Sequence, residues 1–312
     1  MSTMPMLNEL FESHITYPDF AAQERLARLI GLDNQKARLT KILSVLVNPT
    51  SLETWAKKHY PNANGLLNTV LRRPPLVVLA GDVGSGKSEL AETIGDAVAR
   101  QEKIDITLFP LSLSTRGQGR VGEMTQLLSS AFDYTVSEAK KLKGSNGSAR
   151  GGVILLVDEA DALAQSREAA QMHHEDRAGV NAFIRGIDRI GNGYLPAAVI
   201  MCTNRLSALD PAVKRRSADI LTFHRPNDTQ RKAVLTTTLN HLGVTQSQIE
   251  SLVSATGIQP NRKHGFTFSD LTQRLLPAII LDAYPDRPVE ISKAIEIAGT
   301  MIPTPPFKEN LQ

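Results

Sequence analysis

The sequence predicts an α/β protein: a five-stranded parallel sheet flanked by helices, followed by a small helical domain. Three observations lead to this prediction. Apolar, strand-like runs alternate with helical patterns between residues 76 and 223, which is typical of a parallel sheet covered by helices. A glycine-rich loop follows the first of these runs and opens a helix. After Arg225-Pro226 only helical patterns occur.

Composition limits the class of protein. The 312 residues are enough for about two domains, and a content of 41% hydrophobic and 21% charged residues is ordinary for a soluble globular protein. A net charge of +3 is too small to indicate a nucleic-acid partner by itself. The single cysteine, Cys202, suits a reducing cytosol, and its apolar surroundings predict a buried, inert thiol. Since no run of about 18 apolar residues and no signal-peptide pattern occurs, we expect a cytoplasmic protein without a membrane partner.

Residues 1–70 form the first predicted region, an N-terminal arm followed by a helical linker. Residues 1–19 are mixed in character and contain two prolines, so we expect a loosely held arm with at most one helical turn. Apolar spacing predicts a helix from residue 20 and a second helix after Gly31, which ends at Asn48-Pro49. A short amphipathic helix is predicted at residues 52–58.

Residues 71–224 form the predicted α/β domain, and residues 225–312 form a small helical lid domain. Strands are predicted at residues 76–80, 105–111, 153–158, 197–203 and 220–223, and helices at residues 87–101, 121–142 and 180–190. Residues 143–152 are a basic, Gly/Ser-rich connector. The lid helices are predicted at residues 229–242, 246–255, 269–283 and 288–298.

Residues 76–88, LVVLAGDVGSGKS, combine a buried strand with a phosphate-binding loop of the form G-x-x-x-x-G-K-S. Glycines let backbone N–H groups converge on a polyphosphate, and the following helix points its positive end at the same anion. Lys87 is expected to reach the β- and γ-phosphates of ATP, and the Ser88 hydroxyl to bind Mg²⁺. The predicted nucleotide-binding residues of this segment are Gly81, Asp82, Val83, Gly84, Ser85, Gly86, Lys87, Ser88 and Glu89.

A second apolar strand, VILLVDE, ends in two acids. Asp158, beside the phosphate loop, is expected to hold Mg²⁺ partly through its water shell, and Glu159 suits the general base that activates the attacking water. The next strand ends on Asn204, whose amide is expected to orient that water. Acids at strand ends are common, and an asparagine can merely start a turn. The combination with the phosphate loop favours the catalytic interpretation.

Clustered cations follow at residues 209–220, LDPAVKRRSADI. One interpretation is a solvated basic face. The other is an arginine finger, Arg215 or Arg216, which enters the ATP site of a neighbouring subunit and increases the rate by ~10³–10⁵. The second interpretation requires an oligomer, because these arginines are expected to lie far from the nucleotide of their own chain.

The order of these motifs resembles that of the AAA+ ATPases over residues 25–300. The resemblance implies a hexameric ring in which ATP lies between the large domain of one subunit and the arginine finger of the next. Residues 30–36 look like the linker that packs on adenine in this family, which makes Gly31 a nucleotide-binding residue. A hydrophobic staple before a helix explains the same residues.

Two stretches look like the pachytene-checkpoint (thyroid-receptor-interactor) branch of the family: LLVDEADALAQSRE followed by RAGVNAFIRGIDRI, and LDPAVKRRSADILTFHRP. A third similarity is the run RLLP at residues 274–277. That branch remodels HORMA-domain proteins. The short N-terminal region is similar to that of compact bacterial members in antiphage systems that signal with cyclic oligonucleotides. The resemblance therefore implies a HORMA-protein client, bound in turn to a cyclic-nucleotide synthase, and a role as negative regulator.

The sequence departs from the family pattern at two places. The loop that grips a peptide in the ring pore corresponds to Arg120, Val121 and Gly122, with an arginine where an aromatic residue is expected. The long apolar stem of Arg120 can still wedge against a peptide, although a solvated loop that binds nothing is the alternative. In the lid, Leu271 occupies the usual position of the second sensor arginine. Arg274, one helical turn further on, is expected to contact the γ-phosphate or else to form a surface salt bridge.

Two other functions fit parts of the pattern. A generic AAA+ unfoldase that serves a protease shares the same ATPase motifs. A nucleic-acid-binding initiator or loader draws support only from the basic stretch at residues 140–150, and no zinc spacing or helix-turn-helix pattern accompanies it. Adjacent histidines at positions 173 and 174 lack the further ligands of a metal site and predict a polar loop.

Overall fold

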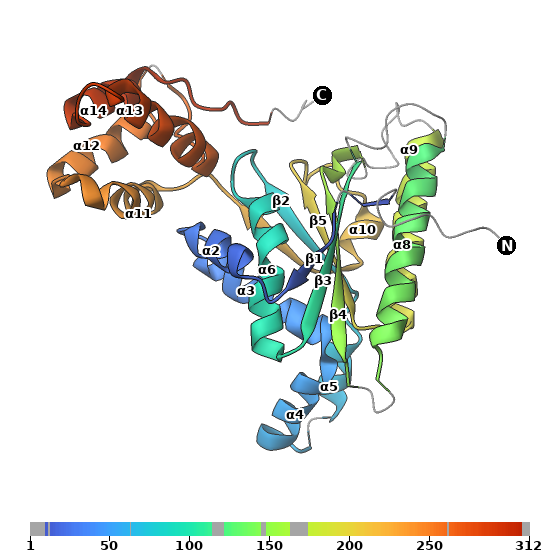
Figure 1. Cartoon of the computed structure of the whole chain (residues 1–312). Coiled ribbons are helices and arrows are strands. Elements are labelled where there is room, and N and C mark those ends of the chain that lie inside the picture. Colours follow the sequence, from blue (N-terminus) through green and yellow to red (C-terminus); the bar gives the residue numbers. More distant parts are fainter. Residues whose placement is uncertain are drawn as a thin grey trace. The chain divides into compact units, whose positions relative to one another are not determined.

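The computed structural model describes residues 10–11, 13–62, 64–113, 122–144, 148–162, 174–260 and 262–307. The chain forms two compact units, drawn in Figure 1. The α/β unit comprises Met1–Ala27, Asn34–Ala80 and Ser88–Thr222. The helical unit comprises Arg28–Asp33, Gly81–Lys87 and Phe223–Gln312.

The α/β unit is built on a six-stranded sheet with the order β1-β3-β4-β5-β2-β6. Strands β3, β4, β5 and β2 pair in parallel, with Leu155 opposite Val199 and Val78 opposite Met201. The residues of β5 are all buried, which explains why the central strands read as continuous apolar runs. The predicted α/β class is confirmed. The strands are β1 (Ile15–Tyr17), β2 (Leu76–Gly81), β3 (Asp105–Ser112), β4 (Gly151–Asp158), β5 (Ala197–Thr203) and β6 (Ser217–Phe223).

The prediction of a loose arm over residues 1–19 is wrong for its last part. Ile15 to Tyr17 form β1, an edge strand that pairs antiparallel with β3. Tyr17 is fully buried, and its hydroxyl donates to the carbonyl of Glu92. Burial and the nearby Glu92 carboxylate raise the pKa of Tyr17 above its ordinary value. The last part of the arm therefore belongs to the core. A three-residue strand beside a proline is too short to show in the periodicity.

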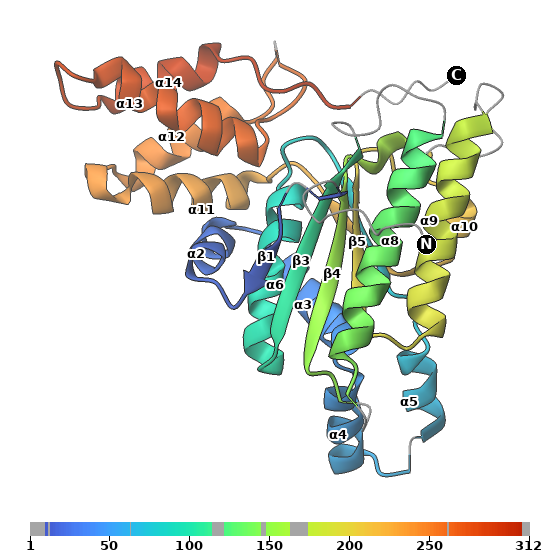
Figure 2. The same ribbon diagram turned by 45° about the vertical axis from the view of Figure 1, so that its right-hand side comes forward.

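Helices cover both faces of the sheet (Figures 1 and 2). Helices α8 (Glu123–Leu142) and α9 (His174–Asn192) lie against one face, whereas α3 (Asp33–Val47) and α6 (Lys87–Glu102) lie against the other. The remaining helices of this unit are α2 (Phe20–Arg28), α4 (Pro49–His59), α5 (Asn64–Leu71), η1 (Ala160–Ala162) and α10 (Pro211–Lys214).

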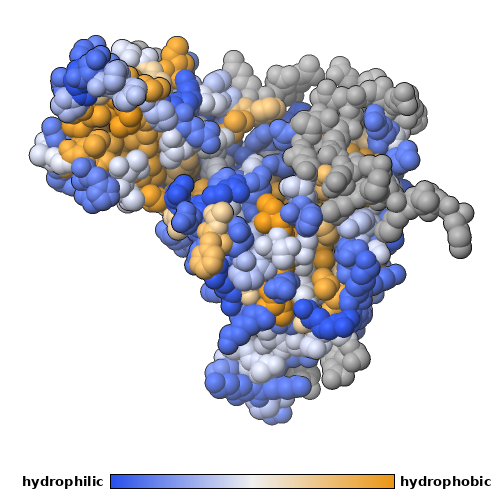
Figure 3. Space-filling view, in the orientation of Figure 1, coloured by the Kyte–Doolittle hydropathy of each residue, from blue (hydrophilic) through white to orange (hydrophobic). Residues whose placement is uncertain are grey.

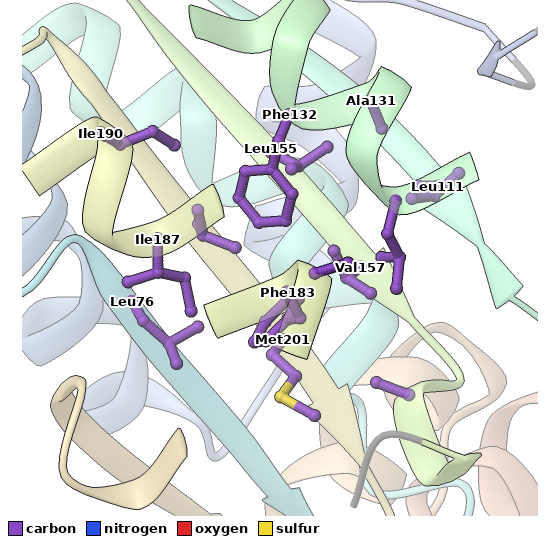
Figure 4. Close-up of a cluster of buried hydrophobic side chains, with 14 of the residues drawn as sticks. Leu76, Leu111, Ala131, Phe132, Leu155, Val157, Phe183, Ile187, Ile190 and Met201 are labelled. Carbon is purple, nitrogen blue, oxygen red and sulfur yellow. The ribbon is translucent and has the colours of Figure 1, made fainter. Parts of the chain in front are cut away.

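The main core lies between the sheet and helices α8 and α9 (Figure 4). The rings of Phe132 and Phe183 meet edge to face at 5.7 Å between centroids. Gly186 allows α9 to approach, because a Cβ built there would lie 2.2 Å from Cγ of Phe132. The apolar spacing of both helices thus positions them tightly on β4 and β5. The predicted buried thiol is also confirmed, since Cys202 is 1% exposed.

The first helix of the C-terminal part of the helical unit is α11 (Asp228–Leu239). Capping boxes define the starts of two helices: Asn227 pairs with Gln230 at α11, and Thr245 pairs with Gln248 at α12. These reciprocal bonds satisfy backbone N–H groups that the helix itself leaves open. The other elements of the unit are η2 (Asn240–Leu242), α12 (Gln246–Thr256), η3 (Asp270–Leu275), α13 (Leu276–Ala283) and α14 (Ile291–Thr300).

The sequence predicts one continuous helix over residues 269–283, and the structure differs in its first turns. The segment η3 is a π-helix that precedes α13. Pro277 explains the difference, because it has no N–H to donate and its ring crowds the carbonyl four residues earlier. The chain widens, and the Leu276 N–H donates to the Leu271 carbonyl five residues back.

Apolar side chains remain on the surface of the helical unit. Figure 3 shows hydrophobic residues gathered on the face of this unit that is turned to the viewer. Its exposed large apolar side chains include Ile258, Leu281, Tyr284 and Ile302, each at least 68% exposed. A patch of this kind on a water-soluble surface is a feature of protein interfaces. Within the described residues, no helix has the length and apolarity needed to cross a membrane.

Candidate functional site

The phosphate-binding loop joins the end of β2 to the start of α6. Its three glycines all have positive φ angles: 156° at Gly81, 69° at Gly84 and 91° at Gly86. At Gly81 a side chain is also excluded by space, because a Cβ would lie 2.0 Å from the carbonyl oxygen of Phe223. The glycines predicted from the motif are therefore required by backbone geometry.

Lys87 lies at the centre of this loop and is only 7% exposed. Its Nζ donates to the carbonyl of Gly81 at 3.0 Å and to the carbonyl of Asp82 at 2.7 Å. The loop thus wraps around its own ammonium group. Helix α6 begins at this residue, so its open N–H groups and positive dipole end belong to the same anion-binding loop.

Glu89, predicted as a nucleotide-binding residue, is engaged within the α/β unit. Its two carboxylate oxygens accept from Nε and Nη2 of Arg25 at 2.7 and 2.8 Å. The bonds to Glu89 and to neighbouring Glu92 raise the pKa of Arg25 above its ordinary value. The pair fastens α2 to the first turn of α6, directly after Ser88.

The two predicted acids lie at the carboxyl end of β4. Asp158 ends the strand, and its Oδ1 accepts the N–H of Glu159 at 2.7 Å. Glu159 has a φ of 52°, in the left-handed region that non-glycine residues rarely adopt. Such a conformation costs about 1–2 kcal/mol and is concentrated at functional sites. The backbone strain falls on the residue assigned as general base.

Asn204 follows β5 in the same α/β unit, and Asp161 holds it in place. The Asp161 carboxylate accepts from the backbone N–H of Asn204 at 2.8 Å and from its Nδ2 at 3.1 Å. It also accepts from the Thr203 hydroxyl at 2.8 Å. The sequence analysis did not single out Asp161. The available signal was its position as the third carboxylate of VDEAD, on the short helix η1.

The two candidate finger arginines differ in their surroundings. Arg216 makes a bidentate pair with Asp188 of α9, at 2.7 and 2.9 Å, and this hydrogen bonding raises the pKa of Arg216. Arg215 is exposed and ends the short helix α10. Arg216 is therefore committed to its own chain, whereas Arg215 projects into solvent.

Gly31, predicted to lie against adenine, belongs to the helical unit together with the phosphate loop. It has a φ of 82°, and its carbonyl accepts from Nε2 of Gln230 on α11 at 2.7 Å. Leu32 lies beside the loop, because a Cβ built on Gly86 would be 3.0 Å from Cδ1 of Leu32. The linker segment thus packs on the phosphate loop, as a platform for the base of a nucleotide requires.

Arg274, predicted as a second sensor, lies on the π-helix η3. Its Nη1 donates to Asp270 at 2.7 Å, and the arginine is 45% exposed. Burial opposes ionisation of Asp270, but hydrogen bonds from Thr267, Thr304 and Arg274 lower its pKa overall. Leu271, at the usual sensor position, is fully buried, so this position belongs to the core.

Part of the predicted site lies outside the described residues. Arg120 and Val121 of the expected pore loop are among these, as are the side chains of the two adjacent histidines. Gly122 is described, and it precedes α8 with a φ of 83°. Among the residues that the structure does describe, no cluster of three His, Cys, Asp or Glu forms a metal site.

Comparison with known proteins agrees with this geometry. Residues 77–225 match the family described as ATPase family associated with various cellular activities (AAA). The described geometry indicates the same class of protein. It combines a glycine-rich loop around a lysine with acids and an asparagine that follow neighbouring strands. The protein is an AAA ATPase: it binds a nucleotide and hydrolyses ATP.

Individual relatives show to which family of AAA ATPases the chain belongs. CD-NTase-associated protein 6 of Escherichia coli (strain MS 115-1) is 67% identical over 307 residues, which cover 98% of this chain and 99% of the relative. The chain belongs to the family of CD-NTase-associated protein 6 within the AAA ATPases.

Solved structures give the same placement. The "Structure of E. coli MS115-1 HORMA:CdnC:Trip13 complex" contains a chain of 65% identity and TM-score 0.90, matched over 98% of this chain and 100% of that one. The "Structure of Rhizobiales Trip13" has 61% identity and TM-score 0.75, with 95% and 100% covered. The predicted membership of the AAA+ class and of its thyroid-receptor-interactor branch is confirmed.

Proposed function

We propose that this ATPase is a remodelling motor that acts in the cytoplasm on a HORMA-domain protein and dissociates its complex with a cyclic-nucleotide synthase. The main support for this proposal is a chain of 65% identity in the solved structure of a HORMA:CdnC:Trip13 complex. The match extends over 98% of this chain. In this function the protein is a negative regulator of a bacterial antiphage system.

The proposed chemistry of ATP cleavage follows from the residues described above. The loop from Gly81 to Ser88 binds the triphosphate through its N–H groups and Lys87. Glu159 takes a proton from the attacking water, and Asn204 orients that water. A hydroxyl at Ser88 and a carboxylate at Asp158 are the hard oxygen ligands that suit Mg²⁺, which neutralises charge on the phosphates when it is bound.

We assign the finger to Arg215 and a supporting role to Arg216. Arg215 is exposed at the end of α10, whereas Arg216 is held by Asp188. An arginine that completes a neighbour's site requires a ring, for which a homo-hexamer is the expected form. The exposed apolar side chains of the helical unit support such an assembly, because they need a protein partner.

Two further roles remain part of the proposal. Arg120, with Val121 and Gly122, grips the client in the pore of the ring. Arg274 contacts the γ-phosphate from the helical unit, where Asp270 holds its guanidinium in a fixed direction. ATP binding and hydrolysis then move the helical unit, and with it the client.

The test is capture of the client by a variant that binds ATP without cleaving it. Glu159→Gln keeps the size of the side chain but removes the base, so we expect ATP binding with turnover lowered by about 10²-fold or more. In ATP this variant should co-elute with a HORMA-domain protein of the relatives' type on size-exclusion chromatography.

The control is Lys87→Ala, which should lose ATP binding and client capture together. Normal ATP turnover by Glu159→Gln would contradict the base assignment. Equal capture of the HORMA-domain protein with and without ATP would contradict the proposed motor function. Retention of a protease or DNA in place of the HORMA protein would favour one of the other AAA+ functions.

A further inference from the structure

The phosphate-binding loop contains a carboxylate of its own. Asp82, its second residue, is 18% exposed. Its Oδ2 accepts from Nε of Arg225 at 2.6 Å. Its Oδ1 accepts the backbone N–H of Val83 at 2.8 Å and that of Phe307 at 3.3 Å. Both oxygens therefore accept hydrogen bonds from groups of the helical unit.

Arg225 connects this carboxylate to the lid. The residue follows β6 and is 16% exposed. Its Nη1 donates to the carbonyl of Gly265 at 2.8 Å, just before the segment that leads into η3. A second link lies close by, since the Ser269 N–H donates to the carbonyl of Gly84 at 3.1 Å. The loop is thus held by the lid at two points.

An acidic side chain is unfavourable in a loop that receives a triphosphate. Like charges a few ångströms apart repel, and the repulsion is stronger where protein excludes water. A guanidinium that is hydrogen-bonded to the carboxylate cancels most of this charge. It also fixes the direction in which the carboxylate points. The pair is largely buried, so it is screened little by salt.

We propose that Arg225 is a positioning residue of the phosphate-binding loop, which neutralises Asp82 and so permits the loop to accept the triphosphate of ATP. Arg225 touches neither nucleotide nor water in this role. It acts through Asp82, and it makes nucleotide affinity depend on the contact between the loop and the lid. The inference concerns ATP binding alone and does not rest on the identity of the client.

The test is a double-mutant cycle on the full chain, with the dissociation constant of ATPγS in Mg²⁺ as the readout. Arg225→Met leaves the Asp82 charge uncompensated, and we expect binding to weaken about tenfold or more. Asp82→Asn removes a like charge, so binding should be equal or tighter. The double variant should return to within about threefold of the unmodified protein, since it has no unpaired charge.

A structural role alone gives a different pattern. If Arg225 only held the lid through Gly265, the double variant would bind as weakly as Arg225→Met, and that result would overturn the proposal. Steady-state kinetics add a second readout: Arg225→Met should raise KM for ATP while kcat stays within about threefold. The matched control is Lys232→Met on α11, which removes one positive charge from the same unit and should leave binding unchanged.

Thermal unfolding without nucleotide shows whether each variant folds. If Arg225→Met does not fold, Asp82→Asn alone decides the question. Binding equal to or tighter than that of the unmodified protein supports the proposal. A loss of about tenfold or more by Asp82→Asn would mean that the carboxylate helps to bind the nucleotide, and would overturn it.

Discussion

In the proposed mechanism, Asp161 determines which end of the Asn204 amide faces the attacking water. A carboxylate only accepts hydrogen bonds, so the Asn204 group that faces it must be the NH₂. The Oδ1 of Asn204 is then left to accept a hydrogen from water. The backbone N–H of Asn204 is bound by the same carboxylate, which fixes the whole residue. In that mechanism, the orientation of the water depends on a residue that does not itself contact the water.

The first prediction at this scale concerns Asp161→Asn. The amide offers one acceptor oxygen in place of two and no charge, so Asn204 loses its fixed orientation. We expect kcat to fall by about 10- to 100-fold, while the affinity for ATPγS stays within about threefold. Asp133→Asn on α8, where the exposed Asp133 pairs with Arg189, is the matched control. An unchanged kcat, or a loss of affinity equal to the loss of rate, would contradict the assignment.

The sequence predicts the site residues whose chemistry is local to a motif. Lys87, Asp158, Glu159 and Asn204 could be predicted because a loop, acids and an amide follow successive strands. The residues that hold parts of the predicted site in position, Asp161 and Arg225, could not be predicted from the sequence. Asp161 binds an atom 43 residues away, and Arg225 binds one 143 residues away, so only the folded chain brings them together.

Among the elements, helices α8 and α9 show how closely packing is set. The Gly186 Cα faces the ring of Phe132 with no room for a side chain. Gly299 on α14 is a helical glycine with open space around the same position. Substitution at Gly299 therefore tests helix propensity alone, whereas substitution at Gly186 also tests the packing of α9 on α8.

We predict opposite signs for two alanine substitutions. Gly299→Ala should raise the free energy of unfolding by up to about 1 kcal/mol, since alanine favours the helix. Gly186→Ala should lower it by about 1–3 kcal/mol, because the new methyl group forces α9 away from α8. Denaturant unfolding, followed for each unit separately, measures both. A stabilised Gly186→Ala variant would show that the helices are less tightly packed than the structure indicates.

Element prediction failed where tertiary contacts outweigh local pattern. Strands β2, β4 and β5 are visible in the sequence because burial on both faces produces continuous apolar runs. Strand β1 is recognised only in the structure, through its pairing with β3, because three residues are too few to show a strand-like alternation in the sequence. The π-helix η3 is a response to Pro277, which the sequence contains but whose effect on the preceding turn depends on packing.

At the scale of the whole molecule, the residues predicted to bind and cleave ATP belong to two different units of the chain. The phosphate loop from Gly81 to Lys87 belongs to the helical unit, whereas Asp158, Glu159 and Asn204 belong to the α/β unit. The chain passes between the units at both ends of the loop. The predicted phosphate-binding loop therefore belongs to the same compact unit as the C-terminal helices.

The last prediction tests the ring and its finger together. A ring made only of Arg215→Ala subunits has the base Glu159 but no finger, and a ring made only of Glu159→Gln subunits has the finger but no base. Each homogeneous protein should therefore be nearly inactive. In rings formed from an equal mixture, an intact Glu159 can meet a neighbour's intact Arg215. We expect the mixture to recover up to about one quarter of the normal ATPase rate, because half of the sites keep the base and half of their neighbours keep the arginine.

The control for this mixture replaces Glu159→Gln by the double variant Glu159→Gln/Arg215→Ala, in which no subunit can donate the arginine. That mixture should stay inactive, although it contains the same number of intact bases. Equal activity in the two mixtures would show that Arg215 does not act across subunits. Normal turnover by Arg215→Ala alone would transfer the role to Arg216 despite its pair with Asp188, and an Arg216→Ala mixture would then show the recovery.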